Sequence, residues 1–192
     1  MVLEVANSLS RPFRPVDLRG RLQQYIELFP QNSIFLRLFD WAESSLRIDD
    51  PVARLLESTV LVEPYDCVNS RVFAIQHEIR TGAVHSTRAA FESALESDAC
   101  RGSVHLWISY IRFCYGHDEL RGRAKDVFHR AVGACPWSKE LYMEAFGTLI
   151  RDMSSSELKA VFQTLTAKGL RVHVDLDEFV GEWKEKQKQR SR

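Results

Sequence analysis

The fold is decided by a stretch of the chain that reads SVHLWISYIRFCY over residues 103–115. Its apolar residues recur at the spacing of one broad helical stripe: Leu106, Trp107, Tyr110, Ile111, Phe113 and Cys114. Such a stripe is typical of a helix that buries one face against other helices. A second stripe of the same kind, over residues 120–132, follows a break at residues 116–118. The two stripes together predict a helical hairpin.

Both kinds of helix recur along the chain at nearly the same interval. Thr87, Arg88, Phe91, Ala94 and Leu95 return 37 positions later as Ala124, Lys125, Phe128, Ala131 and Val132. Leu106, Trp107, Tyr110, Ile111 and Cys114 return 35 positions later as Leu141, Tyr142, Ala145, Phe146 and Leu149. One hairpin cannot bury its apolar stripe alone, so stacked neighbours must cover it. We therefore predict an all-α protein, an α-solenoid of antiparallel helical hairpins.

The expected core of these repeats consists of large apolar residues with small ones between them. Its members are Phe91, Ala94, Leu95, Leu106, Trp107, Tyr110, Phe128, Ala131, Pro136, Leu141, Tyr142 and Phe146. Trp107 and Tyr110 could alternatively stack on bases, but this would need them on the concave surface. Their place within the apolar stripe argues for the core.

The repeats are expected to span residues 17–168, after an irregular lead-in over residues 1–16. The stripe from Leu18 to Phe29 looks like the second helix of a hairpin that has lost its partner. Two capping-box patterns, Ser154 with Glu157 and Asp175 with Glu178, each predict a helix start. We expect the second of these helices to lie in a capping segment over residues 169–184, followed by a basic tail over residues 185–192.

Composition excludes several classes of protein. The chain has 192 residues with 45% hydrophobic residues, which excludes disorder over most of the length. The 26 Lys and Arg residues balance the 26 Asp and Glu residues, so nucleic-acid binding through bulk charge is disfavoured. A local basic run closes the chain and could contact RNA, act as a nuclear address, or simply be a solvated tail. Its members are Lys184, Lys186, Lys188, Arg190 and Arg192.

Sequence signatures of catalysis and of cofactor or metal binding are missing. There is no phosphate-binding loop, dinucleotide-binding turn, HExxH zinc helix or GxSxG elbow. The four cysteines form no CxxC pair, and the nearest metal-like step, Cys114 with His117, lacks the second pair that a structural zinc site needs. We expect no enzyme activity, no cofactor and no metal site.

The pattern resembles the half-a-TPR (HAT) repeat. In that family the first helix carries a Trp and then a Tyr three residues later, as at Trp107 and Tyr110. The second helix carries an aromatic residue followed by an Ala, as in residues 88–95 and 124–132, and a proline such as Pro136 closes the unit. HAT repeats occur in RNA-processing assemblies, so the resemblance implies a TPR-like helical scaffold.

A narrower resemblance lies near the C-terminus. The run from Cys135-Pro136-Trp137 to Ala145, and the run over residues 169–178, are similar to the last repeats of the nuclear RNAi-defective-two (NRDE-2) family. The resemblance implies a nuclear, non-catalytic scaffold for RNA surveillance and RNA-guided silencing, with protein partners in RNA-processing or exosome-linked complexes. Family members are several times longer and contact an RNA helicase through an upstream segment that nothing here resembles. We therefore expect the chain to be a C-terminal fragment or a partial gene model.

Three alternatives stay open at this point. The chain could be a HAT scaffold of pre-mRNA splicing or of 3′-end cleavage, which would share the fold and differ in partners. It could be an RNA-binding helical repeat module with a local basic stripe. It could also form a homodimer through the stripe Leu176, Phe179, Val180 and Trp183, although we expect this stripe to cap the last repeat.

Overall fold

The structure of the chain is a computed structural model that describes residues 15–44, 52, 55–62, 64–170 and 181. Every regular element in these ranges is helical, which confirms the all-α prediction for this part of the chain. The chain divides into two compact units, Met1–Arg101 (unit 1) and Gly102–Arg192 (unit 2). Such an arrangement of helices is compatible with a helical repeat protein. The two units are described separately below.

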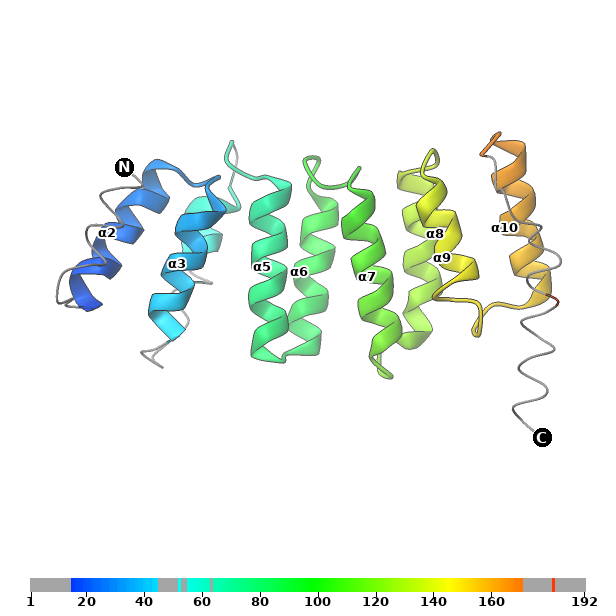
Figure 1. Cartoon of the computed structure of the whole chain (residues 1–192), viewed down its shortest axis with the longest axis horizontal. Coiled ribbons are helices and arrows are strands. Elements are labelled where there is room, and N and C mark those ends of the chain that lie inside the picture. Colours follow the sequence, from blue (N-terminus) through cyan, green and yellow to red (C-terminus); the bar gives the residue numbers. More distant parts are fainter. Residues whose placement is uncertain (1–14, 45–51, 53–54, 63, 171–180, 182–192) are drawn as a thin grey trace. The chain divides into compact units, whose positions relative to one another are not determined.

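The described residues of unit 1 form two helical hairpins (Figure 1). Helix α2 (Pro15–Leu28) packs against α3 (Ser33–Ser44), and α5 (Val68–Thr81) packs against α6 (Val84–Glu96). A π-helical turn (Leu56–Val60) contacts both α2 and α5, and α3 contacts α5 directly. The α2–α3 hairpin is therefore packed against α5, both directly and through the π-helical turn.

Helix α2 packs against α3. The sequence assigned the stripe from Leu18 to Phe29 to the second helix of a hairpin without its partner; the residues before Pro15 lie outside the described ranges, so this stays a prediction. The rings of Tyr25 and Phe35 stack between the two helices, with centroids 5.4 Å apart. One buried cluster joins α2, α3, the π-helical turn and α5, and includes Leu22, Ile26, Phe35, Leu36, Phe39, Val52, Leu55, Leu56, Val60, Phe73 and Ala74.

The α5–α6 hairpin is fixed at both ends. Gly82 ends α5 with φ of 76°, a left-handed conformation that glycine adopts without steric cost. At the other end, the guanidinium of Arg71 donates to both oxygens of Asp66 at 2.7 and 2.8 Å, and the Ser97 hydroxyl donates to the same carboxylate at 2.7 Å. Burial opposes ionisation of Asp66, but these hydrogen bonds outweigh it and lower the pKa of the carboxyl.

The described residues of unit 2 form two further hairpins (Figure 1). Helix α7 (Val104–Gly116) packs against α8 (Ala124–Ala134), which a short 3-10 turn precedes. Helix α9 (Lys139–Phe146) packs against α10 (Ser155–Ala167) and also contacts α7 and α8. The helix expected over residues 103–115 thus lies within one residue of its predicted position.

In unit 2 the start of α10 matches its sequence signal, whereas α9 ends before its apolar stripe does. The capping box of α10 is present, since Ser154 Oγ accepts from Glu157 N at 3.2 Å and Glu157 Oε2 accepts from Ser154 N at 2.6 Å. Helix α9 ends earlier than its stripe suggests, at Phe146. Leu149 is nevertheless fully buried. Its N–H donates a hydrogen bond to the Glu144 carbonyl at 3.0 Å, and this bond turns the chain inward after the helix.

Three ion pairs join the hairpins of unit 2. Arg112 pairs with Glu144 at 2.6 Å, Arg121 with Asp152 at 3.0 Å, and Lys125 with Glu157 at 3.0 Å. The partners in each pair are 31 or 32 residues apart in the chain. Each pair therefore links the α7–α8 hairpin to the segment that runs from α9 through α10. The pairs add to the apolar packing between these helices.

Several predicted features lie outside the described residues. They include almost all of the capping segment over residues 169–184, the Asp175–Glu178 capping box and the basic tail over residues 185–192. The stripe considered for homodimer formation lies there too. The predictions made for these residues stay predictions.

Candidate protein-binding groove

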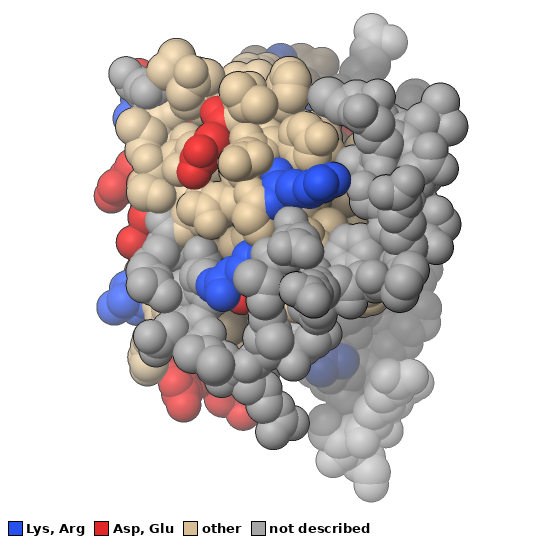
Figure 2. Space-filling model, turned by 90° about the vertical axis from the view of Figure 1, so that its left-hand side faces the viewer, with Lys and Arg blue, Asp and Glu red and all other residues tan. Residues whose placement is uncertain are grey.

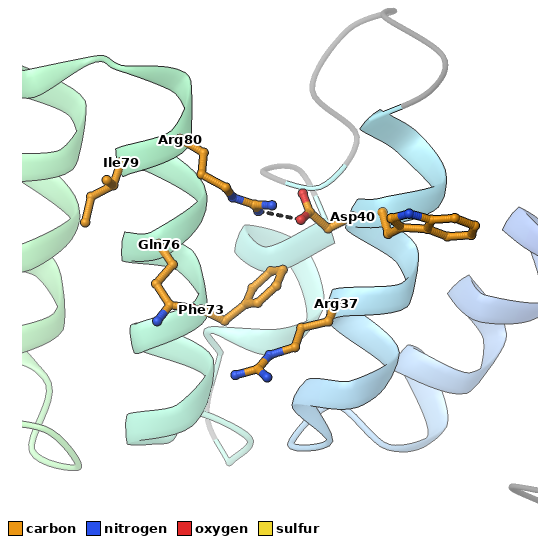
Figure 3. Close-up of a pocket in the computed structure, with 7 residues that line it drawn as sticks. Arg37, Asp40, Phe73, Gln76, Ile79 and Arg80 are labelled. Atoms are coloured by element: carbon orange, nitrogen blue, oxygen red, sulfur yellow. Dashed lines mark hydrogen bonds and ion pairs between the residues drawn. The ribbon is translucent and has the colours of Figure 1, made fainter.

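A cavity of about 480 Å³ lies in unit 1 between α3 and α5 (Figure 3). We call it the α3–α5 groove. Its lining residues come from these two helices alone: Arg37, Asp40, Trp41, Phe73, Gln76, Ile79 and Arg80. On α3 the lining residues follow a helical spacing of three to four, and on α5 they do the same. The groove is therefore a surface depression between two helix faces.

The apolar part of the groove has a buried floor and an exposed rim. Phe73 projects from α5 toward α3 (Figure 3) and is only 4% exposed. Trp41 is 64% exposed and Ile79 is 48% exposed, with Ile79 on the side of α5 that faces away from α3 (Figure 3). Large apolar side chains that stay this exposed beside a cavity are typical of a binding surface.

A carboxylate cluster bridges the two helices at one end of the groove. Asp40 on α3 accepts a hydrogen bond from the guanidinium of Arg80 on α5, as Figure 3 shows. The imidazole Nδ1 of His77 lies 3.1 Å from the other oxygen of the same carboxylate. The Asp40 side chain is 10% exposed, so its charge is held largely inside the protein and is balanced there. This cluster fixes the relative position of α3 and α5.

Two polar side chains of the groove make no ion pair or hydrogen bond with the part of the chain that the structure describes. Arg37 on α3 and Gln76 on α5 both line the groove and are exposed, and the Arg37 guanidinium reaches toward α5 (Figure 3). A guanidinium offers five N–H donors, and a carboxamide offers two donors and one acceptor oxygen. The groove therefore combines an apolar floor with unused hydrogen-bonding capacity from both helices.

The structure places the residues of the expected repeat core in the interior. Eleven of the twelve are buried, each with at most 4% of its surface exposed, and Pro136 is partly exposed. Trp107 also lies beneath the guanidinium of Arg130, 5.5 Å from its ring centroid. Burial leaves Trp107 and Tyr110 no face on which a base could stack.

Analysis of the sequence missed the α3–α5 groove. On α3, Trp41 is exposed, whereas Phe35, Leu36 and Phe39 are buried. A usable signal was present, because Ile34 and Trp41 are seven residues apart and so share a face with Arg37. Ile34 is also exposed, at 63%. An apolar pair at this spacing on a second face of the helix indicates a surface role.

Among the residues that the structure describes, no group of three or more His, Cys, Asp or Glu side chains could hold a metal ion. No helix in the described ranges is long and apolar enough to cross a membrane. Figure 2 faces the α2 end of unit 1, where uncharged side chains make up most of the described surface and a few charged ones lie among them.

The chain has curated relatives in two mammals. It is 31% identical over 185 residues to Nuclear exosome regulator NRDE2 of Mus musculus, and the match covers 84% of this chain and 15% of the mouse protein. It is similar to a segment of NRDE2. The human NRDE2 is 27% identical over 183 residues, with the same shares of the two chains covered. These matches confirm the family resemblance that the C-terminal motifs indicate.

The chain spans about 15% of the length of these curated NRDE2 proteins. No protein-family model matches the chain, and no solved structure matches it. Both relatives carry the word nuclear in their names, which agrees with the nuclear location that the resemblance implies. Their names also place them with the exosome, in agreement with an RNA-related role.

Proposed function

We propose that this chain is a non-catalytic protein-interaction scaffold that acts in nuclear RNA surveillance. The observation that carries the proposal is the α3–α5 groove, an exposed apolar surface with unused polar groups in a chain similar to a segment of two nuclear exosome regulators. Its helical hairpins would be HAT-like repeats, and its partners would belong to nuclear RNA-processing or exosome-linked complexes. A role in RNA-guided silencing is part of the same proposal, through the family resemblance.

The similarity to exosome regulators favours this proposal over a HAT scaffold of splicing or 3′-end cleavage. The ion pairs that the basic residues make within the protein favour protein partners over RNA. Many of the cations in the described ranges are paired with carboxylates within the protein, including Arg19, Arg71, Arg80, Arg112, Arg121 and Lys125. A cation that already has a carboxylate partner gains less from a phosphate.

Affinity purification from nuclear extract tests the proposal. The tagged chain is compared with a Trp107→Asp variant, in which a charge at a buried position should prevent folding. We expect RNA-processing or exosome-linked proteins to be enriched severalfold by the folded chain, and to remain bound after ribonuclease treatment. If no such protein is enriched, the scaffold proposal is wrong. If all enriched proteins are lost on ribonuclease treatment, RNA binding is the better description.

A further inference from the structure

We propose that the α3–α5 groove binds an acidic linear peptide segment of a partner protein, with one large apolar side chain of that segment as its anchor. This inference deepens the proposed function and rests on it, because it specifies the chemistry of the partner. It is argued below from the size of the groove, its apolar surfaces and its charges.

The size of the groove suits a peptide segment. Its volume of about 480 Å³ is within the range of sites that enclose a small ligand or one or two large side chains. The walls are two helices, whose backbone groups are already hydrogen-bonded within each helix. An added strand therefore cannot extend a sheet here, and recognition has to come from side chains. A segment that lies between two helices and inserts an anchor meets this condition.

The apolar surfaces define the anchor. Phe73 forms the floor at 4% exposure, and Trp41 at 64% stands on the α3 side of the groove. A leucine, methionine or phenylalanine that covers Phe73 and reaches the α3 edge at Trp41 would remove apolar surface from water on both sides of the contact. Aromatic residues beside a pocket frequently carry most of the energy of such interfaces. Trp41 is therefore the expected main contact for the anchor.

The charges define the rest of the segment. Asp40 is only 10% exposed and is already matched by Arg80 and His77, so it presents little negative charge to a ligand. Arg37 has no carboxylate partner among the described residues, and the Arg80 side chain is 57% exposed. The open face of the groove is therefore cationic, and carboxylates on the ligand would pair with it in bidentate geometry.

The carboxamide of Gln76 adds a group that can bind the peptide backbone. It lies on α5 opposite Arg37 (Figure 3), and a carboxamide can both donate to and accept from a peptide backbone. A nucleic acid could use the two guanidiniums, but it has no aliphatic side chain to fill the space above Phe73. The combined apolar and cationic surface therefore favours an acidic peptide over RNA.

Selection from a random peptide library displayed on phage tests the inference directly. The folded full chain is the bait, and variants Arg37→Glu and Trp41→Ala are compared with Arg21→Glu. Arg21 is exposed on α2, does not line the groove and has no partner among the described residues, so its variant changes the net charge equally. Circular dichroism confirms that all four proteins are folded. Fluorescence anisotropy then measures the dissociation constant of the most enriched peptide.

We expect the enriched peptides to be rich in Asp and Glu around a Leu, Met or Phe. Arg37→Glu should weaken binding about tenfold or more, since an attractive charge becomes repulsive. Trp41→Ala should weaken it about fivefold or more, and Arg21→Glu by less than about twofold, as expected for a remote charge. Added salt should weaken binding by the wild-type chain more than binding by Arg37→Glu.

The inference is overturned if no peptide is enriched, if the enriched peptides are not acidic, or if Arg37→Glu binds as well as Arg21→Glu. It is also overturned if polyuridine RNA displaces the peptide at lower concentration than the unlabelled peptide does, which would assign the groove to nucleic acid. The nuclear-extract purification distinguishes failure of this inference from failure of the scaffold proposal. If the Arg37→Glu variant still recovers the same RNA-processing proteins, the scaffold stands and its partners bind elsewhere.

Discussion

Replacing Tyr142 by phenylalanine should make the protein more stable. Tyr142 on α9 is 1% exposed, and its hydroxyl has no hydrogen-bond partner among the residues that the structure describes. A buried hydroxyl without a partner costs about 1–3 kcal/mol, because it loses its bonds to water and gains none. Tyr142→Phe keeps the ring that fills the core and removes that cost. We expect a gain of about 1 kcal/mol in the free energy of unfolding.

Urea denaturation followed by far-ultraviolet circular dichroism measures the effect. With a denaturant slope of about 1–3 kcal/mol/M, the midpoint should rise by about 0.3–1 M, while the slope stays unchanged. Tyr110→Phe is the matched control, because Tyr110 is equally buried and its hydroxyl does not lack a partner in this way. That variant should be no more stable than the wild type. A midpoint that falls for Tyr142→Phe would refute the reasoning, since it would mean that the hydroxyl is satisfied.

The remaining predictions concern helix capping, acid and thiol reactivity. Ser154→Ala should lower the free energy of unfolding by about 1 kcal/mol through loss of the α10 cap, measured by urea denaturation; an unchanged midpoint would contradict it. Hydrogen bonds from the backbone and hydroxyl of Ser154 and from Lys125 lower the pKa of Glu157 from 4.5 to about 2. The ionised carboxylate therefore stabilises the fold above about pH 4.5, and this contribution is lost as the pH falls toward 2. The stability difference between wild type and Glu157→Gln should accordingly shrink over that range, and a constant difference would be evidence against the coupling. Burial raises the pKa of the Cys100 thiol to about 11, so iodoacetamide at pH 8 should label Cys67, which is partly exposed, before Cys100; peptide mapping that finds the reverse order would show that Cys100 is accessible.

Local periodicity was enough to predict much of unit 2. The stripe over residues 103–115 corresponds to α7, and the spacing of Ser154 and Glu157 marks the start of α10. Both signals act within one or two helical turns, so the residues that create them are close in the chain. The repeat interval extended this information to the alternation of helices along the chain.

The α3–α5 groove depends on information that periodicity does not carry. Helix α3 is apolar around more than one face, so its sequence does not say which face is buried. The pairing with α5 decides it, and that pairing depends on contacts such as Asp40 with His77 and Arg80, at separations of 37 and 40 residues. For the same reason the sequence did not show that α2 pairs with α3.

The three ion pairs of unit 2 have a consequence for how the chain can change in length. Every pair spans residues 126–143, since its partners lie on either side of that range. An insertion or deletion there that shifted the following helices would displace Glu144, Asp152 and Glu157 together from their cationic partners. Related chains that keep these pairs should therefore vary in length outside this range, and a length change inside it should appear as a loop that bulges outward without moving α10.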